Sequence, residues 1–86
     1  MKIEKKIWPE YFEAILAGKK KFELRLADFD VKKGDILVLR EWEPKTKEYT
    51  GRILEKEAVY IIKTKNLKFW PDEKIKKFGY QIISFE

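Results

Sequence analysis

The sequence predicts a small α+β domain in which a mostly antiparallel sheet curls into a short β-barrel and carries two short helices. Three observations support this fold class. Two segments with helix signals each begin at a proline and end at a glycine, several apolar runs have the length of strands, and most connections between them are short. With 86 residues and no cysteine, we expect a single domain over residues 1–86 without disulfides.

The expected elements follow one another in the order β-α-β-β-β-α-β. Residues 1–7 form a short first strand, and a helix of two turns follows over 9–17. Pro9 suits the first helical position because its missing N–H would have no partner there, and Gly18 is a typical helix stop. The helix depends on packing of one apolar stripe, made of Tyr11, Phe12, Ile15 and Leu16.

The centre of the chain predicts three strands. Apolar and charged residues alternate over 19–26, which is typical of a half-buried strand. Residues 36–39 are apolar on both faces and predict a central strand. The polar segment 43–50 reads as a hairpin connection, and residues 52–63 form a long strand with a bend near 55–57.

The end of the chain predicts a second helix and a last strand. Pro71 begins the helix, acidic residues favour its positive N-terminal end, and Gly79 stops it. Residues 80–85 form the final strand. Since a small antiparallel sheet must hide its edges, closure into a barrel is expected.

Composition limits the chemistry. The chain has no histidine, so we expect no imidazole-based metal site or general base, and Ser84 has no histidine to activate it. We expect no metal and no cofactor. An enzyme built from this chain would have to use Lys, Glu, Asp, Tyr, Thr or Arg.

Composition also indicates a location and an environment. No apolar run approaches the length of a membrane span, and the N-terminus lacks the apolar core of a signal peptide. We therefore expect a cytoplasmic protein without a membrane partner. The abundance of Lys, Glu and Ile resembles that of heat-adapted proteins.

The net charge of +5 favours anionic partners, nucleic acid first. The excess is concentrated in residues 17–25 and 61–77, where aromatic residues interleave with lysines, a combination that suits single-stranded nucleic acid. The lysines of the second segment are candidate phosphate contacts, chiefly Lys63, Lys65 and Lys68. The alternative is two separate solvated faces.

The stretch GKKKFELR, residues 18–25, poses a sharper question. Its alternation places Lys21, Glu23 and Arg25 on one face of the expected strand, with Lys20 at the preceding turn. A surface that only holds polyanions needs no carboxylate, so Glu23 indicates selective recognition. The alternative is an ordinary strand face whose exposed ion pairs contribute little.

The spacing Gly18, Lys20, Glu23, Arg25 is similar to the G-x-K-x-x-E-x-R signature of the ASCH domains, a branch of the PUA-like superfamily. The segments IWPEYFEAILAGKKKFELR, VKKGDILVLREWEP and KEYTGR extend the resemblance over nearly the whole chain, toward small ASCH-related proteins described as RNA-binding-like. It implies a compact β-barrel whose signature lines a cleft for RNA or a modified nucleoside.

The resemblance also implies residue roles. Lys20 would contact a phosphate or a polarised carbonyl, Glu23 would accept hydrogen bonds from an exocyclic amine, and Arg25 would bind phosphate or brace Glu23. One ASCH branch removes the acetyl group from acetylcytidine, but it has a threonine where this chain has Glu23. If this chain is an enzyme, Lys20 and Glu23 would carry the catalysis.

The main expectation is therefore an RNA- or nucleotide-binding module that acts as a monomer. Its expected site comprises Gly18, Lys20, Lys21, Glu23, Arg25, Lys63, Lys65 and Lys68. A small amidohydrolase acting on an acylated nucleoside and a protein-interaction domain on a PUA-like fold are the alternatives.

Overall fold

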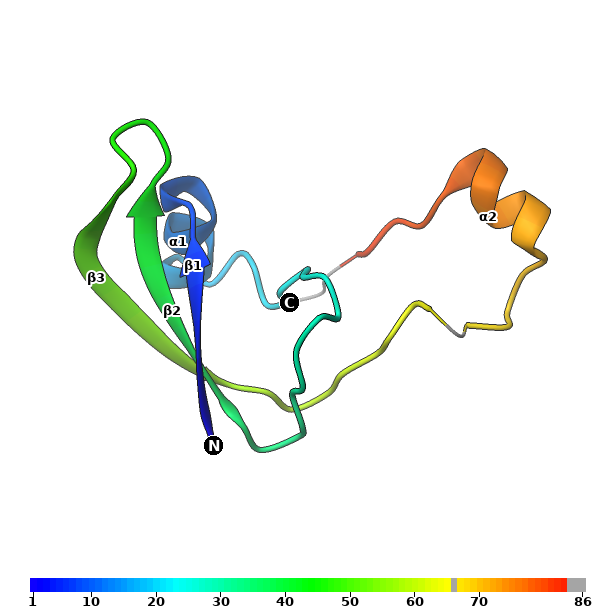
Figure 1. Ribbon diagram of the computed structural model, residues 1–86, viewed down its shortest axis with the longest axis horizontal. Helices are drawn as coiled ribbons and strands as arrows, with labels where there is room; N and C mark the ends of the chain where they lie inside the picture. The colour runs from blue at the N-terminus through cyan, green and yellow to red at the C-terminus, as the bar shows by residue number, and fades with distance from the viewer. Residues whose placement is uncertain (66, 84–86) are drawn as a thin grey trace.

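The computed structural model describes residues 1–65 and 67–83, which form a three-stranded sheet and two helices (Figure 1). The elements are β1 (Lys2–Ile7), α1 (Pro9–Leu16), β2 (Ile36–Glu43), β3 (Glu48–Glu57) and α2 (Asp72–Phe78). The domain is therefore α+β with two short helices, as the sequence predicts.

The sheet has the order β1-β2-β3 and is mixed rather than mostly antiparallel. β1 pairs with β2 in parallel, from Lys2 opposite Ile36 to Ile7 opposite Glu41. β2 and β3 form an antiparallel hairpin across the polar connection, as expected. Three strands leave the sheet open, because a closed barrel needs more strands around its axis.

Three expected strand regions are not strands in the structure. Residues 19–26 run in an irregular path, β3 ends at Glu57 so that 59–63 are not paired, and 80–83 are also irregular. Residues 84 and 85 of the expected last strand lie outside the described residues. Period-two alternation and β-branched side chains permit a strand, but only a neighbouring strand supplies its hydrogen bonds.

The expected bend of β3 is present nearer its start than 55–57. The register shifts between Arg40 and Trp42, which face Ile53 and Tyr49 on β3, so three residues of β3 lie opposite Glu41. Gly51 is in the middle of these three and has φ +96°, a conformation that glycine adopts at no steric cost. The irregularity turns Thr50 and Arg52 toward Glu41.

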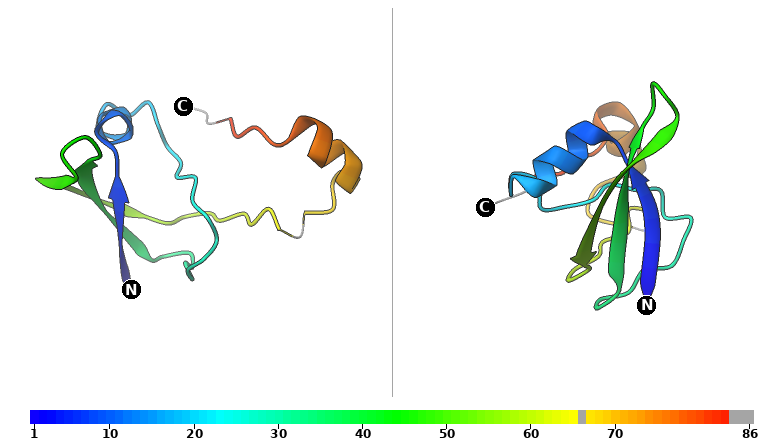
Figure 2. Two further views of the ribbon diagram at one scale, coloured as in Figure 1. Left: turned by 45° about the horizontal axis from the view of Figure 1, so that its top comes forward. Right: turned by 90° about the vertical axis from the view of Figure 1, so that its left-hand side faces the viewer.

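One face of the sheet carries the core, and α1 covers it (Figure 2). The core consists of Ile7 from β1, Phe12 and Ile15 from α1, and Leu39 from β2. Leu37 and Leu54 continue this face and are only partly buried. Of the predicted apolar stripe of α1, Phe12 and Ile15 are buried as expected, whereas Tyr11 and Leu16 remain 46% and 54% exposed.

The chain falls into two regions, the body (residues 1–58) and the arm (residues 59–83). Ala58 belongs to the body because it exchanges backbone hydrogen bonds with Gly34 and Asp35. The arm runs away from the sheet and carries α2 at a distance from it (Figure 1). The Cα radius of gyration is 14.8 Å, whereas a compact chain of this length would have about 12 Å.

Candidate ligand-binding site

The GKKKFELR stretch begins where α1 ends. Gly18 has φ +75° and donates its backbone N–H to the carbonyl of Ile15, so it stops the helix as predicted. The next two amides, of Lys19 and Lys20, both donate to the carbonyl of Ala14. These bonds fix the backbone at Lys20 against the last turn of the helix.

Lys20, Glu23 and Arg25 converge on one another and form what we call the Glu23 triad. The Lys20 Nζ lies 2.7 Å from Oε1 of Glu23, and the Arg25 Nε lies 2.7 Å from Oε2 of the same carboxylate. The side chains of Lys20 and Glu23 are only 14% and 15% exposed. Partial removal from water strengthens such charge-assisted bonds.

The triad is tied to both α1 and β1. The Lys20 ammonium also donates to the carbonyl of Phe22 at 2.7 Å, and it lies 5.9 Å from the centre of the Tyr11 ring of α1. Arg25 donates through Nη2 to the backbone carbonyl of Lys6 in β1. The triad therefore occupies the side of the sheet next to β1, although residues 19–26 do not form a strand.

A hollow of about 290 Å³ adjoins the triad at Arg25. Basic, acidic, aromatic and aliphatic side chains line it, namely those of Lys5, Leu24, Arg25, Leu26, Asp28 and Phe29. Lys5 lies 3.7 Å from the centre of the Phe29 ring. Leu24 and Leu26 remain 68% and 80% exposed, so this hollow offers both charge and apolar surface.

The other predicted site residues lie elsewhere. Lys21 is exposed, and within the described residues no ion pair reaches it, so Lys21 does not take part in the ion pairs of Glu23. The reason is that Lys20, held at the helix end, reaches Glu23 first. Lys65 and Lys68 line a separate hollow in the arm, of about 570 Å³, and Lys63 is not among its lining residues.

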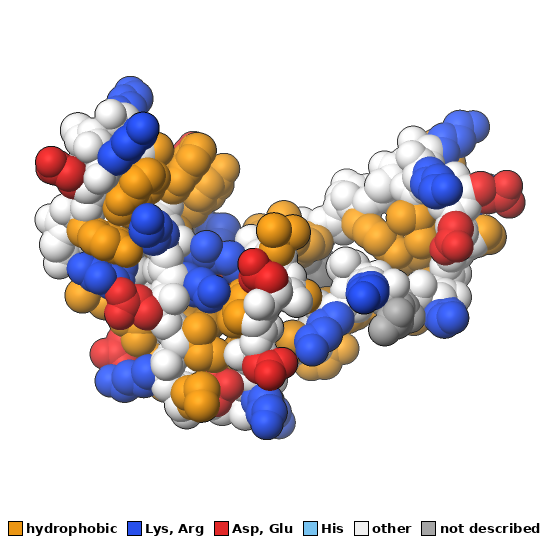
Figure 3. Space-filling model, viewed as in Figure 1, with side chains coloured by type: hydrophobic (Ala, Val, Ile, Leu, Met, Phe, Trp, Pro, Cys, Tyr) orange, Lys and Arg blue, Asp and Glu red, His pale blue; other side chains and the backbone are white. Residues whose placement is uncertain are grey.

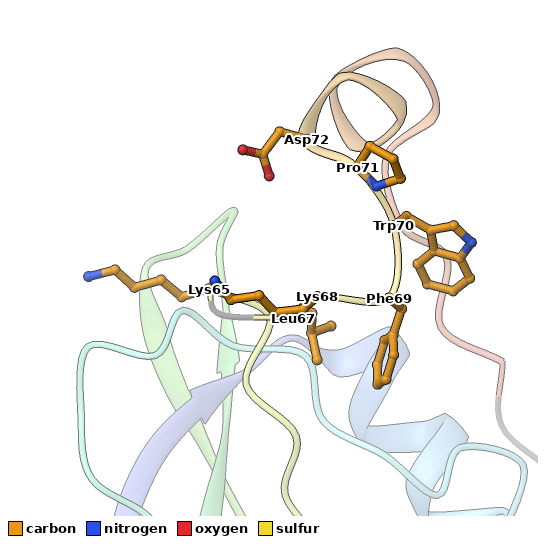
Figure 4. Close-up of a pocket in the computed structure, with 7 residues that line it drawn as sticks. All are labelled: Lys65, Leu67, Lys68, Phe69, Trp70, Pro71 and Asp72. Carbon is orange, nitrogen blue, oxygen red and sulfur yellow. The ribbon is translucent and has the colours of Figure 1, made fainter.

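Two lysines and two aromatic residues are among those that line the hollow in the arm (Figure 4). Phe69 and Trp70 meet edge to face with ring centres 5.8 Å apart. The remaining lining residues are Leu67, Pro71 and Asp72. The structure thus separates the two basic segments of the sequence into two places.

A second carboxylate cluster, centred on Glu41, was not anticipated. Glu41 is 3% exposed and lies on the core face of β2. The Arg52 guanidinium donates to both of its oxygens, at 2.9 and 2.7 Å, and the Thr50 hydroxyl donates at 2.5 Å. The same guanidinium binds Glu13 of α1 and lies 4.5 Å from the centre of the Phe12 ring.

The Glu41 cluster stays charged. Hydrogen bonds from Arg52, and next from Thr50, hold the pKa of the Glu41 carboxyl below its ordinary value against the opposing effect of burial. The pKa of Arg52 is raised by its bonds to Glu41 and Glu13. Both carboxylate oxygens of Glu41 accept hydrogen bonds from β3, and Arg52 of β3 also binds Glu13 of α1. The cluster therefore joins β2, β3 and α1.

A signal for Glu41 was present in the sequence. It follows Leu37 and Leu39 at a spacing of two, so a strand that buries the leucines must bury the carboxylate as well. A buried carboxylate requires a cation, and which arginine supplies it depends on strand pairing.

Residues 3–78 match the family described as "Domain of unknown function (DUF3850)". The chain belongs to this family. As a DUF3850 domain it is also similar to a protein of Escherichia phage P2 described as "Uncharacterized 12.9 kDa protein in GpA 3'region", with 40% identity over 52 residues.

That match covers 60% of this chain and 46% of the phage protein, so the aligned part is about half of the relative's length. No solved structure matches this DUF3850 domain. Within residues 1–65 and 67–83, neither helix has the length and apolar character to cross a membrane. In the same part of the chain, no three acidic side chains gather in a way that could hold a metal ion.

Proposed function

We propose that this DUF3850 domain binds RNA or a nucleotide-like ligand at the Glu23 triad and the adjoining hollow. The observation that carries the proposal is the Glu23 carboxylate, held between Lys20 and Arg25 and largely covered from water. A fixed carboxylate accepts hydrogen bonds from exocyclic amines such as N4 of cytosine. The two cations beside it are suited to a phosphate.

The triad retains capacity for a ligand. Its internal bonds use two of the three N–H groups of Lys20 and two of the five N–H groups of Arg25. Each carboxylate oxygen of Glu23 accepts one bond within the described residues and has a second lone pair. The arrangement can therefore accept from a base and donate to a phosphate at once.

The resemblance to the ASCH domains supports the same proposal, since three of its four signature residues form the triad. The same resemblance implies a PUA-like barrel, and closure of the sheet into such a barrel is part of the proposal. Exposed apolar segments support closure, because residues 24–26, 59–62 and 80–83 could cover the partly buried end of the core face at Leu37 and Leu54. Slow amide exchange in these segments is expected if the barrel closes, and fast exchange contradicts it.

The test is binding of labelled oligocytidine and oligouridine to the full chain, followed by fluorescence anisotropy. Affinity should fall steeply between low and moderate salt, because the net charge of +5 displaces counterions from the phosphates. Glu23→Gln should reduce the preference for cytosine over uracil by about five- to 150-fold. Glu73→Gln, an exposed carboxylate of α2, is the matched control.

Two results would contradict the proposal. An RNA affinity that does not change between low and moderate salt would exclude phosphate binding. An unchanged base preference in Glu23→Gln, with binding intact, would remove the triad from recognition.

One observation supports a second candidate function. The Lys20 Nζ and the Glu23 Oε1 are 2.7 Å apart, which places an acid–base pair within reach of a bound carbonyl. A small amidohydrolase would use this pair on an acylated nucleoside. Incubation with acetylcytidine should then release acetate with the wild type and not with Lys20→Ala, and no release from the wild type excludes that substrate.

A further inference from the structure

The outer face of the sheet, opposite α1, carries a cluster of cations on aromatic rings. Arg40 and Trp42 of β2, Lys6 of β1 and Tyr49 of β3 form this cluster, which we call the outer platform. The Arg40 guanidinium lies 3.7 Å from the centre of the Tyr49 ring, and the Lys6 Nζ lies 4.6 Å from the centre of the Trp42 ring. Trp42 and Tyr49 are cross-strand partners.

The rings of the outer platform are partly exposed, and a hydrogen bond holds its arginine in place. Tyr49 is 40% exposed, and Trp42 is half-buried. Glu4 accepts a hydrogen bond from Arg40 at 2.7 Å and so helps to hold the guanidinium over the tyrosine ring. The Arg40 side chain remains 34% exposed, and unpaired bases stack on guanidinium planes as they do on aromatic rings.

The outer platform is continuous with the Glu23 triad. Arg25 donates to the backbone carbonyl of Lys6, and the side chain of the same Lys6 reaches Trp42. The Lys6 ammonium is also 5.8 Å from the centre of the Tyr49 ring. One residue of β1 therefore links the triad to the aromatic pair across the edge of the sheet.

We infer that an RNA strand held at Glu23 continues over the outer face, where an unpaired base stacks on the Tyr49 ring or on the Arg40 guanidinium that lies over it. Lys6 contacts the phosphate between the two positions. The inference rests on the proposed function and defines its ligand as single-stranded RNA, because the faces of paired bases in a duplex are covered. Sequence preference then comes from the triad, and the platform adds affinity for any base.

The experiment compares Tyr49→Ala with the wild type in the anisotropy assay with labelled oligocytidine. We expect an affinity loss of about five- to 150-fold, the usual effect of removing one stacking side chain. Tyr49→Phe should retain most of the affinity, since the ring remains. Tyr60→Ala is the matched control, because Tyr60 is 81% exposed and lies in the arm.

A second measurement leaves the platform intact. In a Trp8→Phe, Trp70→Phe chain, Trp42 is the remaining tryptophan of the sequence. Its emission should be quenched as single-stranded RNA is added, and the same strand annealed to its complement should bind more weakly and quench less. Equal binding of duplex and single strand would overturn the inference.

The outcomes separate this inference from the proposed function. If Glu23→Gln alters binding and Tyr49→Ala does not, the triad binds RNA and the platform is wrong. If Tyr60→Ala weakens binding as much as Tyr49→Ala, stacking is not confined to the platform and the inference is also wrong. If the wild type binds no RNA, both proposals are wrong.

Discussion

The body and the arm share the local signals of a short helix but have very different surroundings. Each contains a short helix that starts beside a Trp-Pro pair and ends near a glycine. The body buries Ile7, Phe12, Ile15 and Leu39, whereas none of the described arm residues is buried. Hydrophobic side chains lie open at the surface of the arm (Figure 3).

The difference shows that local signals and packing are separate requirements. α2 has acidic residues in its first turn and basic residues in its last, which favour the helix dipole. Its seven residues would be marginal as an isolated helix. α1 has the same kind of start, yet its apolar stripe meets Leu39 and Ile7, so α1 is stabilised by the sheet as well.

The largest expected effect compares one residue type in the two regions. Phe12 is 2% exposed and Phe78 is 71% exposed. Phe12→Ala should lower the free energy of unfolding by about 3–5 kcal/mol, and Phe78→Ala by less than about 0.5 kcal/mol. Urea unfolding followed by circular dichroism measures both, and a similar cost for Phe78→Ala would mean that the arm packs on the body in solution.

A smaller effect is expected at the Glu41 cluster. Arg52→Ala leaves the buried Glu41 carboxylate without its main partner, which is costly in a covered site. Arg40→Ala, which breaks the more exposed pair with Glu4, is the control. The thermal unfolding temperature should drop several times more for Arg52→Ala, and equal drops would show that Glu41 is reached by water.

The pH dependence of stability follows from the same carboxylate. The pKa of Glu41 is lowered from the ordinary value of 4.5, mainly by Arg52. At a pH between the folded and the unfolded pKa, the unfolded chain therefore binds more protons than the folded chain. Its contribution is complete above about pH 4.5 and is lost as the pH falls through the folded pKa.

Urea midpoints measured across this range should therefore fall with acidity in the wild type and less steeply in Glu41→Gln. The comparison concerns the slope, so a constant loss of stability in the variant does not affect it. Identical slopes would assign the acid sensitivity to other carboxylates of the body, such as Asp35, whose pKa is lowered mainly by the Lys32 backbone amide.

The smallest expected effect concerns the hairpin at the far end of the body. Gly51 has φ +96°, and an added Cβ would meet no atom within 4 Å, so Gly51→Ala carries only the backbone cost of about 1–2 kcal/mol. Lys47 has φ +57° in the same hairpin, so Lys47→Gly should shift stability in the opposite direction. Equal shifts of one sign in the two urea curves would contradict this.

Several parts of the fold could be predicted from the sequence. Pro9 and Gly18 bound α1, Pro71 and Gly79 bound α2, and the polar segment between Trp42 and Tyr49 forms the hairpin. These signals are local, because each depends on backbone geometry within a few residues. The residues around Glu23 in the sequence also mark it as a candidate site residue, although the expected strand around it is not formed.

Only the tertiary structure decided which residues meet across long separations. The parallel pairing of β1 with β2 joins residues 34 positions apart, such as Lys2 and Ile36, and no local pattern specifies such a partner. That pairing places Lys6 between the Glu23 triad and the aromatic pair Trp42 and Tyr49, and the shifted register of β3 brings Arg52 to Glu41. The physical reason is that alternation assigns a side chain to a face, whereas register and packing select its neighbours.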